Sequence, residues 1–171
     1  MTAHLRFALA ATLFAAPCLA QTATVTFYTP GNSAKSTAAG LLPRSTQPFT
    51  GWLFDGKQSL AHVRAGRFMS FRLKPGAHSF TVPWHSDKPG KEPLVINVEA
   101  GGQYCIRLST KMTNPEVVPF EWLDSQIEEV PCGRAAQEAA GMKPIDIKRV
   151  DPAVRAELDS ATTFPIATQE H

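Results

Sequence analysis

The chain has 171 residues, and its 17 Lys and Arg residues against 15 Asp and Glu residues give a formal net charge of +2 at pH 7. Because this charge is small and no block of like charges occurs, the composition argues against nucleic-acid binding and against a basic tail for an anionic membrane. The 14 prolines interrupt the chain too often for long helices and favour short strands joined by turns.

The first 20 residues have the pattern of a cleavable signal peptide. Arg6 adds a positive charge close to the amino terminus, and residues 7–16 are uncharged and mostly apolar. This run is shorter than the roughly 20 residues that a membrane-spanning helix needs, and Pro17 ends it. The small Ala20 predicts cleavage before Gln21. We therefore expect an exported chain of about 150 residues, one domain in size, without a transmembrane segment.

Cys18 leaves a second possibility open for the amino terminus. A cysteine that follows a short apolar segment can be acylated and become the new first residue, which would anchor the protein to a membrane. Pro17, directly before this cysteine, fits such a site poorly. Cleavage before Gln21 is therefore the main prediction, and a lipid anchor on Cys18 is the alternative.

Two cysteines remain after removal of the signal peptide, Cys105 and Cys132. An even pair in an oxidising compartment most simply forms one disulfide. The bond would close a loop of about 28 residues, which a chain-entropy model values at about 3.5 kcal/mol. Free thiols, a metal pair or a redox couple are the alternatives, but no Cys-x-x-Cys spacing or histidine cluster supports them.

Apolar and polar residues alternate with a period of two along most of the chain up to position 130, which is typical of strands with one buried face. Asp55-Gly56, Pro75-Gly76 and Gly101-Gly102 are turn signals between the alternating stretches. The predicted strands lie at about 22–28, 49–54, 58–63, 69–73, 80–84, 94–98, 104–108 and 120–130. Seven or so short strands at regular spacing predict a β-sandwich of the immunoglobulin-like or prealbumin-like kind.

Residues 29–48 follow neither periodicity and are rich in Gly, Ser, Thr, Ala and Pro. Such a composition is typical of an exposed loop, here an insertion at 31–47. A loop of this length is unusual, so it is either a mobile insertion, which we prefer, or a functional arm.

The carboxyl-terminal region differs from the strands. Residues 132–140 are rich in Ala, Gln and Glu and precede Gly141, which predicts a short helix. A second helix is expected at Asp151-Pro152, where Asp can cap the first amides. Its few apolar residues predict loose packing or none, with residues 162–171 disordered. The chain is thus divided into a signal peptide (1–20), a β-sandwich domain (21–132) and a partly helical extension (133–171).

Four turn motifs occur in a fixed order along the predicted sandwich. They are Asp55-Gly56-Lys57, Ala65-Gly66-Arg67-Phe68, Lys74-Pro75-Gly76-Ala77-His78-Ser79-Phe80 and Val98-Glu99-Ala100-Gly101-Gly102-Gln103-Tyr104. This set resembles a bacterial group of exported domains of unknown function. It resembles more distantly the PEGA-type β domains of surface and envelope proteins, which share the Asp-Gly-Lys hairpin and the Pro-Gly-x-His step.

The resemblance extends from about Ala23 to Cys132, apart from the insertion at 31–47, and ends at about Gly141. It implies a sandwich domain in the bacterial envelope, periplasmic or extracellular. It implies no catalytic residues.

Patterns for catalysis and metal binding are weak. His62, His78, His85 and His171 lack a histidine or carboxylate at metal-site spacing, so no metal and no cofactor is predicted. His85-Ser86-Asp87 contains the residue types of a hydrolase triad, but neighbours in a chain cannot form the required relay. His78 is expected to decorate a strand.

Aromatic residues give the best candidate for a binding surface. Trp52, Trp84 and Trp122 are most simply core residues, yet exported sandwiches often bind glycans or peptides through aromatics. Trp84 is the strongest of the three because it adjoins the polar loop that contains His85 and Asp87. These three residues, Trp84, His85 and Asp87, are the predicted binding surface.

Two functional hypotheses follow. The first is a non-catalytic module that binds an envelope protein or glycan by strand addition or aromatic contact, and it requires an exposed sheet edge or apolar patch. The second is an envelope hydrolase acting on peptidoglycan or another glycan. Its site would have to be assembled from scattered residues such as His85, Asp87, Glu121 and Asp124.

Overall fold

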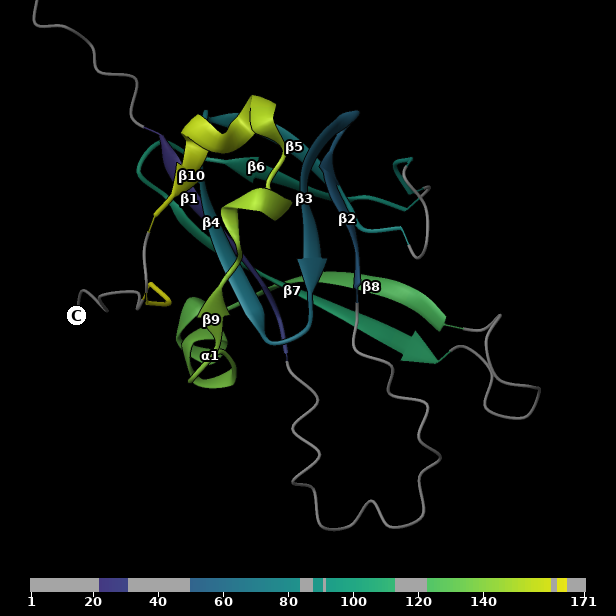
Figure 1. The fold of residues 1–171 in the computed structure, drawn as a ribbon. Helices are drawn as coiled ribbons and strands as arrows, with labels where there is room; N and C mark the ends of the chain where they lie inside the picture. The colour runs from purple at the N-terminus through teal and green to yellow at the C-terminus, as the bar shows by residue number, and fades with distance from the viewer. Residues whose placement is uncertain are drawn as a thin grey trace, which may run out of the picture.

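Two β-sheets form the body of the molecule in the computed structural model (Figure 1). The structure describes residues 22–30, 50–83, 88–90, 92–112, 123–160 and 163–165, with the backbone alone at 110–112 and 123–124. The expected signal peptide (1–20) and loop insertion (31–47) lie outside the described residues.

The larger sheet has the strand order β10-β4-β1-β7-β8, with β9 also paired to β4. Its strands are β1 (Ala23–Thr29), β4 (Arg67–Leu73), β7 (Gln103–Met112), β8 (Leu123–Val130), β9 (Lys143–Pro144) and β10 (Leu158–Asp159). The central strand β1 pairs antiparallel with β4 and parallel with β7.

The smaller sheet has the order β3-β2-β5-β6. Its strands are β2 (Thr50–Asp55), β3 (Gln58–Arg64), β5 (Gly76–Thr81) and β6 (Leu94–Val98). The helical elements are α1 (Cys132–Glu138) and the short 3-10 turns η1 (Ile147–Arg149) and η2 (Pro152–Glu157). The prediction of a mainly β sandwich with a short helical carboxyl-terminal region is confirmed.

The core lies between the two sheets and is built from their alternating apolar residues. Phe27 of β1 meets Phe80 of β5 edge to face, with ring centroids 4.9 Å apart, so this contact joins the two sheets. Around them lie the fully buried side chains of Val25, Leu53, Val63, Phe71, Ile106 and Leu108. Burial of each such side chain contributes about 1.5–3 kcal/mol before the conformational entropy cost.

The strand expected at 80–84 lies earlier in the chain. β5 begins at Gly76, where φ is +139°, and ends at Thr81. Its register with β6 runs from Gly76 opposite Val98 to Phe80 opposite Leu94. Pro83 lacks an amide hydrogen and cannot continue the ladder. Of the residues in the expected strand, Phe80 and Thr81 belong to β5 and Val82 follows its end, while Trp84 lies outside the described residues.

The carboxyl-terminal segment packs on the sandwich, so the prediction of loose packing for its second helix is wrong. Val150 and Val154 are buried in the main core together with Ile145. The Asp151 carboxylate accepts a hydrogen bond from the Ala153 amide at 2.9 Å, as expected for a cap. The buried residues come from short turns and extended pieces, which explains why no helical stripe was visible.

Helix α1 begins at the disulfide and covers a second, smaller cluster. Cys132 is bonded to Cys105 of β7 with a Cα–Cα distance of 5.2 Å, which confirms the predicted pair. Ala135 of the helix and Ala139, which directly follows it, pack against Tyr28 and Phe68.

The ring of Phe164 meets the same two aromatic side chains edge to face, at 5.6 Å from Tyr28 and 5.5 Å from Phe68. The expectation of disorder throughout 162–171 is therefore wrong at Phe164.

Candidate functional site

Most residues proposed from the sequence for a site lie beyond the part of the chain that the structure describes. This holds for Trp84, His85 and Asp87 and also for Glu121, while Asp124 has a described backbone only. The surface at Trp84 and the hydrolase hypothesis therefore stay predictions.

Two outer edges of the sandwich are covered by the chain's own carboxyl-terminal segment. β9 and β10 pair with β4, through Arg67 opposite Lys143 and Phe71 opposite Leu158. At the edge of the other sheet, the Asp151 amide donates to the carbonyl of Leu60 in β3 at 2.9 Å. Next to it, Val150 forms an antiparallel bridge with Ala61. No pattern in the sequence indicated that this segment covers the edges, because β9 and β10 have only two residues each.

The opposite edge of the larger sheet is β8, which is open as far as the described residues extend. All eight residues of β8 are paired with β7, from Leu123 opposite Met112 to Val130 opposite Cys105. Among the described strands, none lies on the other side of β8. Alternate residues of an antiparallel strand direct both backbone groups away from the partner, so half of β8 presents donors and acceptors outward.

The hairpin of β7 and β8 also extends past the rest of the sandwich (Figure 1). β1 pairs with β7 only as far as Arg107, whereas β7 continues to Met112. The outer half of the hairpin is thus bounded, within the described residues, by its own two strands.

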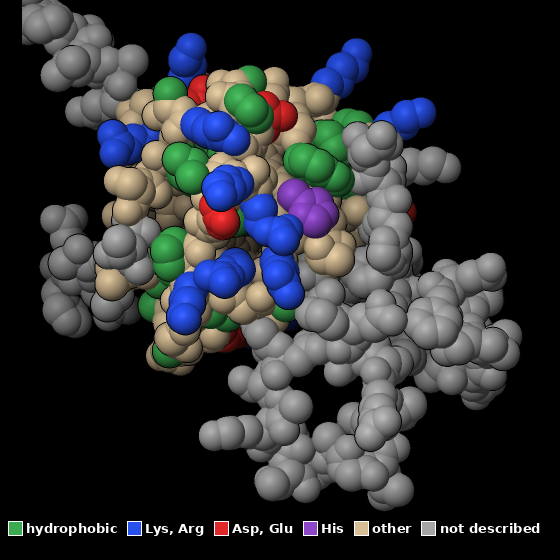
Figure 2. Space-filling view, in the orientation of Figure 1, with side chains coloured by type: hydrophobic (Ala, Val, Ile, Leu, Met, Phe, Trp, Pro, Cys, Tyr) green, Lys and Arg blue, Asp and Glu red, His purple; other side chains and the backbone are tan. Residues whose placement is uncertain are grey.

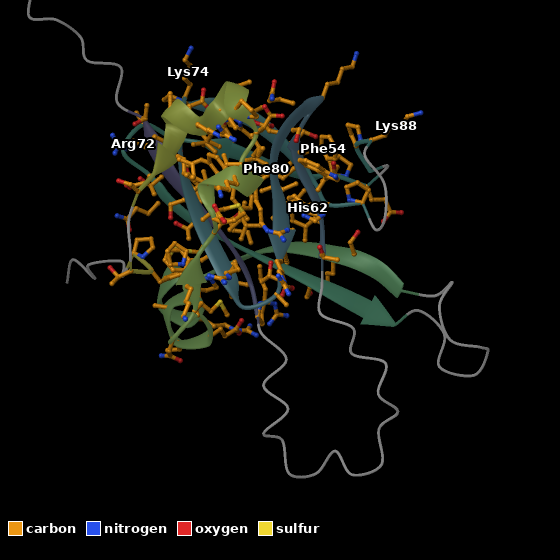
Figure 3. All side chains as sticks on the ribbon, viewed as in Figure 1. Phe54, His62, Arg72, Lys74, Phe80 and Lys88 are labelled. Carbon is orange, nitrogen blue, oxygen red and sulfur yellow. A yellow bond between two sulfur atoms is a disulfide. The ribbon has the colours of Figure 1, made fainter. Side chains whose placement is uncertain are left out.

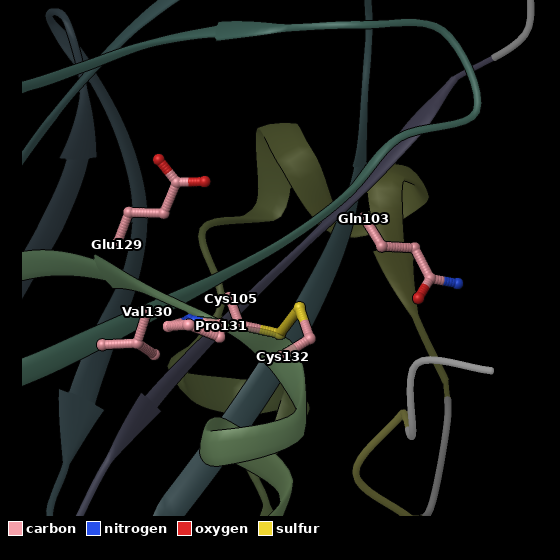
Figure 4. Close-up of a pocket in the computed structure, with 6 residues that line it drawn as sticks. All are labelled: Gln103, Cys105, Glu129, Val130, Pro131 and Cys132. Atoms are coloured by element: carbon pink, nitrogen blue, oxygen red, sulfur yellow. A yellow bond between two sulfur atoms is a disulfide. The ribbon is translucent and has the colours of Figure 1, made fainter. Parts of the chain in front are cut away.

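Acidic side chains mark the open strand. Glu129 is exposed, and the neighbouring Glu128 forms a cross-strand ion pair with Arg107. Where β8 ends, a hollow of about 390 Å³ adjoins it (Figure 4). The hollow is lined by Gln103, Cys105, Glu129, Val130, Pro131 and Cys132. Its two cysteines are bonded to each other, so it offers no thiol nucleophile.

The second open edge, β6, is shorter and partly occupied. Val95 is 64% exposed and is one of the large apolar side chains that face solvent. The Tyr104 hydroxyl, however, accepts a bond from the Glu99 amide at 2.9 Å and donates to the Asn97 carbonyl at 3.4 Å. This side chain covers the end of β6, which leaves β8 as the longer free edge.

A groove with a basic wall lies beside the covered edge of β3. Trp52 of β2 and His62 of β3 are directly opposite each other, with ring centroids 5.1 Å apart. Arg149 of η1 reaches the histidine, with Nη1 2.8 Å from His62 Nδ1. Burial, and then the charge of Arg149, hold the pKa of His62 below its ordinary value.

His78 forms a structural contact. Its Nδ1 bonds the Asp55 carboxylate, and its Nε2 lies 2.9 Å from the Lys74 carbonyl oxygen. Burial alone would lower the pKa of His78, but these hydrogen bonds outweigh it and raise the pKa above its ordinary value. Because both ring nitrogens have acceptors, neither is free to take a proton from a substrate.

Glu138 organises the contact between α1 and the larger sheet. Its carboxylate accepts hydrogen bonds from the Tyr28 hydroxyl at 2.8 Å and from Arg134 Nε at 2.7 Å. Arg107 approaches the same carboxylate at 3.4 Å. Burial raises the pKa of Glu138, but the bonds from Tyr28, Arg134 and Arg107 prevail and lower it. Both oxygens of the Glu138 carboxylate thus have partners, and the cluster fits a structural role.

The described part of the chain contains no group of three or more His, Cys, Asp or Glu side chains arranged to hold a metal ion. Within the same residues, no helix has the length and apolar character needed to cross a membrane.

Comparisons with protein-family models, with curated proteins and with solved structures gave no match. The class of protein that the fold defines is a disulfide-bonded β-sandwich whose own carboxyl-terminal segment closes one side, while β8 and β6 are edge strands among the described residues.

Proposed function

We propose that this protein is a non-catalytic binding module of the bacterial envelope that docks a partner by adding a strand to β8. The observation that carries the proposal is the free outer edge of β8, eight residues long and paired only with β7 among the described strands. Strand addition uses the main-chain groups of such an edge for affinity and the flanking side chains for specificity.

The contrast between the sheet edges that the carboxyl-terminal segment covers and the edge at β8 supports this function. The carboxyl-terminal segment closes the β3 and β4 edges with hydrogen bonds and buried apolar side chains. An exposed edge attracts indiscriminate pairing, and proteins normally cover or charge it. A chain whose described residues cover two edges but not the long projecting strand β8 has that strand available for a specific contact.

Charge on β8 defines the partner further. Glu129 is exposed, and Glu128 lies one residue away. Two copies of β8 aligned with their Glu129 residues opposite each other would bring like charges together, which disfavours that pairing of the protein with itself. A partner strand with Lys or Arg opposite Glu129 is favoured instead, and the hollow beside Val130 gives one of its side chains a place to dock.

An extracytoplasmic location is part of the proposal. The disulfide between Cys105 and Cys132 is of the kind that persists in oxidising compartments. The sequence pattern of residues 1–20 and the resemblance to exported envelope domains favour the same location. Whether the mature chain starts at Gln21 or is anchored through a lipid on Cys18 is tested by the intact mass of the exported form.

Photocrosslinking in living cells tests the function. A benzoylphenylalanine at Glu129 on β8 is compared with one at Ala77, which is exposed on the interior strand β5. We expect a reproducible protein adduct from position 129, identified by mass spectrometry, and none from position 77. Equal adducts from both positions, or none from position 129, would contradict docking at β8.

A further inference from the structure

The groove beside β3 has two unlike walls. Trp52 and His62 project from the outer face of the hairpin β2–β3, and Lys148 and Arg149 stand opposite them on η1. Val150, Asp151 and Pro152 complete the lining of a groove of about 370 Å³. This volume lies at the lower end for ligand sites and suits a single ring with its substituents. Figure 2 shows Lys and Arg side chains gathered on this face around a histidine, which Figure 3 labels as His62.

The contact between Arg149 and His62 fixes the hydrogen-bonding character of the groove. A guanidinium can only donate, so Nδ1 of His62 accepts and the neutral ring carries its proton on Nε2. This leaves the Nε2 hydrogen as a donor for a ligand. The lowered pKa of His62 agrees with a neutral ring.

The positive charges of the groove are not balanced by ion pairs. Within the described residues, neither Lys148 nor Arg149 lies within ion-pair distance of a carboxylate. The nearby Asp146 and Asp151 each use an oxygen to cap a turn, accepting from the amides of Lys148 at 3.0 Å and Ala153 at 2.9 Å. Among the described residues, the lining thus carries two cations against the single carboxylate of Asp151.

These features specify the chemistry of a ligand. A guanidinium presents paired N–H groups that match a carboxylate, and the neighbouring Lys148 ammonium adds charge. The half-buried indole of Trp52 offers an apolar surface on the other wall, which complements the C–H face of a pyranose ring. A sugar whose carboxylate is attached directly to the ring brings both groups within one ring's width of each other.

We propose that this groove binds one carboxylate-bearing sugar unit of an acidic glycan, with the carboxylate on Arg149 and Lys148 and the ring against Trp52. The Nε2 hydrogen of His62 then donates to a ring hydroxyl or to the carboxylate. The site is separate from β8, so it neither requires strand addition nor excludes it.

Nuclear magnetic resonance titration of the oxidised exported chain tests this site with three probes: glucuronate, glucose and inorganic phosphate. We expect glucuronate to shift the indole N–H of Trp52 and the ring signals of His62, and to bind about tenfold or more tightly than glucose. Phosphate should bind more weakly than glucuronate, because it has no ring to contact Trp52.

Three variants assign the contacts. Arg149→Gln should weaken glucuronate binding about tenfold or more, since it removes a charge-assisted bond. Lys57→Gln is the matched control, because this exposed residue lies in the turn of the same hairpin and its loss should leave binding unchanged. Trp52→Ala should weaken glucuronate binding and leave phosphate binding as it was. A thermal unfolding curve for each variant confirms that it is folded.

Three results would overturn the proposal. The first is the absence of chemical shift changes with glucuronate, and the second is an unchanged affinity for glucuronate in Arg149→Gln. The third is an affinity for phosphate equal to that for glucuronate, with neither affinity changed by Trp52→Ala. Each leaves the crosslinking result at β8 unaffected, so the two proposals fail independently.

Discussion

The Asp55 carboxylate joins two strands of the smaller sheet, β2 and β5: its Oδ2 lies 2.5 Å from His78 Nδ1 and its Oδ1 accepts from the Ser79 amide at 3.0 Å. Asp55 belongs to the Asp-Gly-Lys motif and His78 to the Pro-Gly-x-His motif. These two of the four motifs behind the resemblance, the ones shared with the PEGA-type domains, are therefore the two halves of one contact between β2 and β5. Their joint presence has a structural reason and needs no catalytic one.

His78 should make stability depend on pH. Its pKa is raised in the folded protein, so its contribution is fully present below the unfolded value of about 6.5 and is lost as pH rises through the folded pKa. We expect His78→Gln to cost about 1–2 kcal/mol at pH 5.5 and less at pH 9. Denaturant unfolding at the two pH values measures this, and a cost that grows with pH would contradict the assignment.

His62 should show the opposite dependence. Because its pKa is lowered in the folded protein, its contribution is present above about 6.5 and is lost as pH falls through the folded pKa. The stability difference between the native protein and His62→Gln should therefore shift in favour of the native protein as pH rises from 5 to 7.5. Denaturant unfolding across this pH range checks the direction of the change. His78→Gln, whose stability effect depends on pH in the opposite sense, is the comparison.

The disulfide should stabilise the packing of α1 on the larger sheet. Replacing both Cys105 and Cys132 by Ser should cost about 2–4 kcal/mol, because the unfolded chain loses a constraint and the helix loses its covalent tie to β7. The measurement is urea unfolding of the double variant against the oxidised native protein. A cost below about 0.5 kcal/mol would show that the bond contributes little to folding.

Val154 tests whether the carboxyl-terminal segment belongs to the fold. Its side chain is 5% exposed and lies in the main core, whereas that of Ala153 is exposed. We expect Val154→Ala to cost about 1–3 kcal/mol, since the substitution leaves a cavity. Ala153→Ser is the control and should stay within about 0.5 kcal/mol of the native protein. Equal effects of the two substitutions would mean that the segment packs loosely after all.

Strands were predictable from the sequence where one face is buried. In β6, for example, Ile96 and Val98 are buried and Val95 and Asn97 are exposed, as the alternation predicts. The central strand β1 is instead buried on both faces, because Thr26 and Tyr28 are buried along with Val25 and Phe27. The short strands β9 and β10 were not predictable, because two residues carry no periodicity and their pairing with β4 is set by the rest of the fold. Val154 lies in a short 3-10 turn without a helical stripe, so its burial in the core was not predictable either.

The groove was missed because of a β-bulge. With a regular ladder from the turn, where Asp55 faces Gln58, Trp52 would face Ala61. The register shifts after Phe54, so Leu60 is the extra residue and Trp52 faces His62 instead. Contact with Arg149, 87 positions away from His62, depends on the tertiary fold and leaves no local signal in the sequence.

The most direct test of docking at β8 is proline substitution at two neighbouring positions, Ser125 and Gln126, combined with crosslinking from position 129. In an antiparallel strand, one of the two amides points outward and the other bonds β7. The variant that keeps the stability of the native protein has lost an outward amide, and we predict that it loses the crosslinked partner. Undiminished crosslinking in that variant would contradict strand addition at β8.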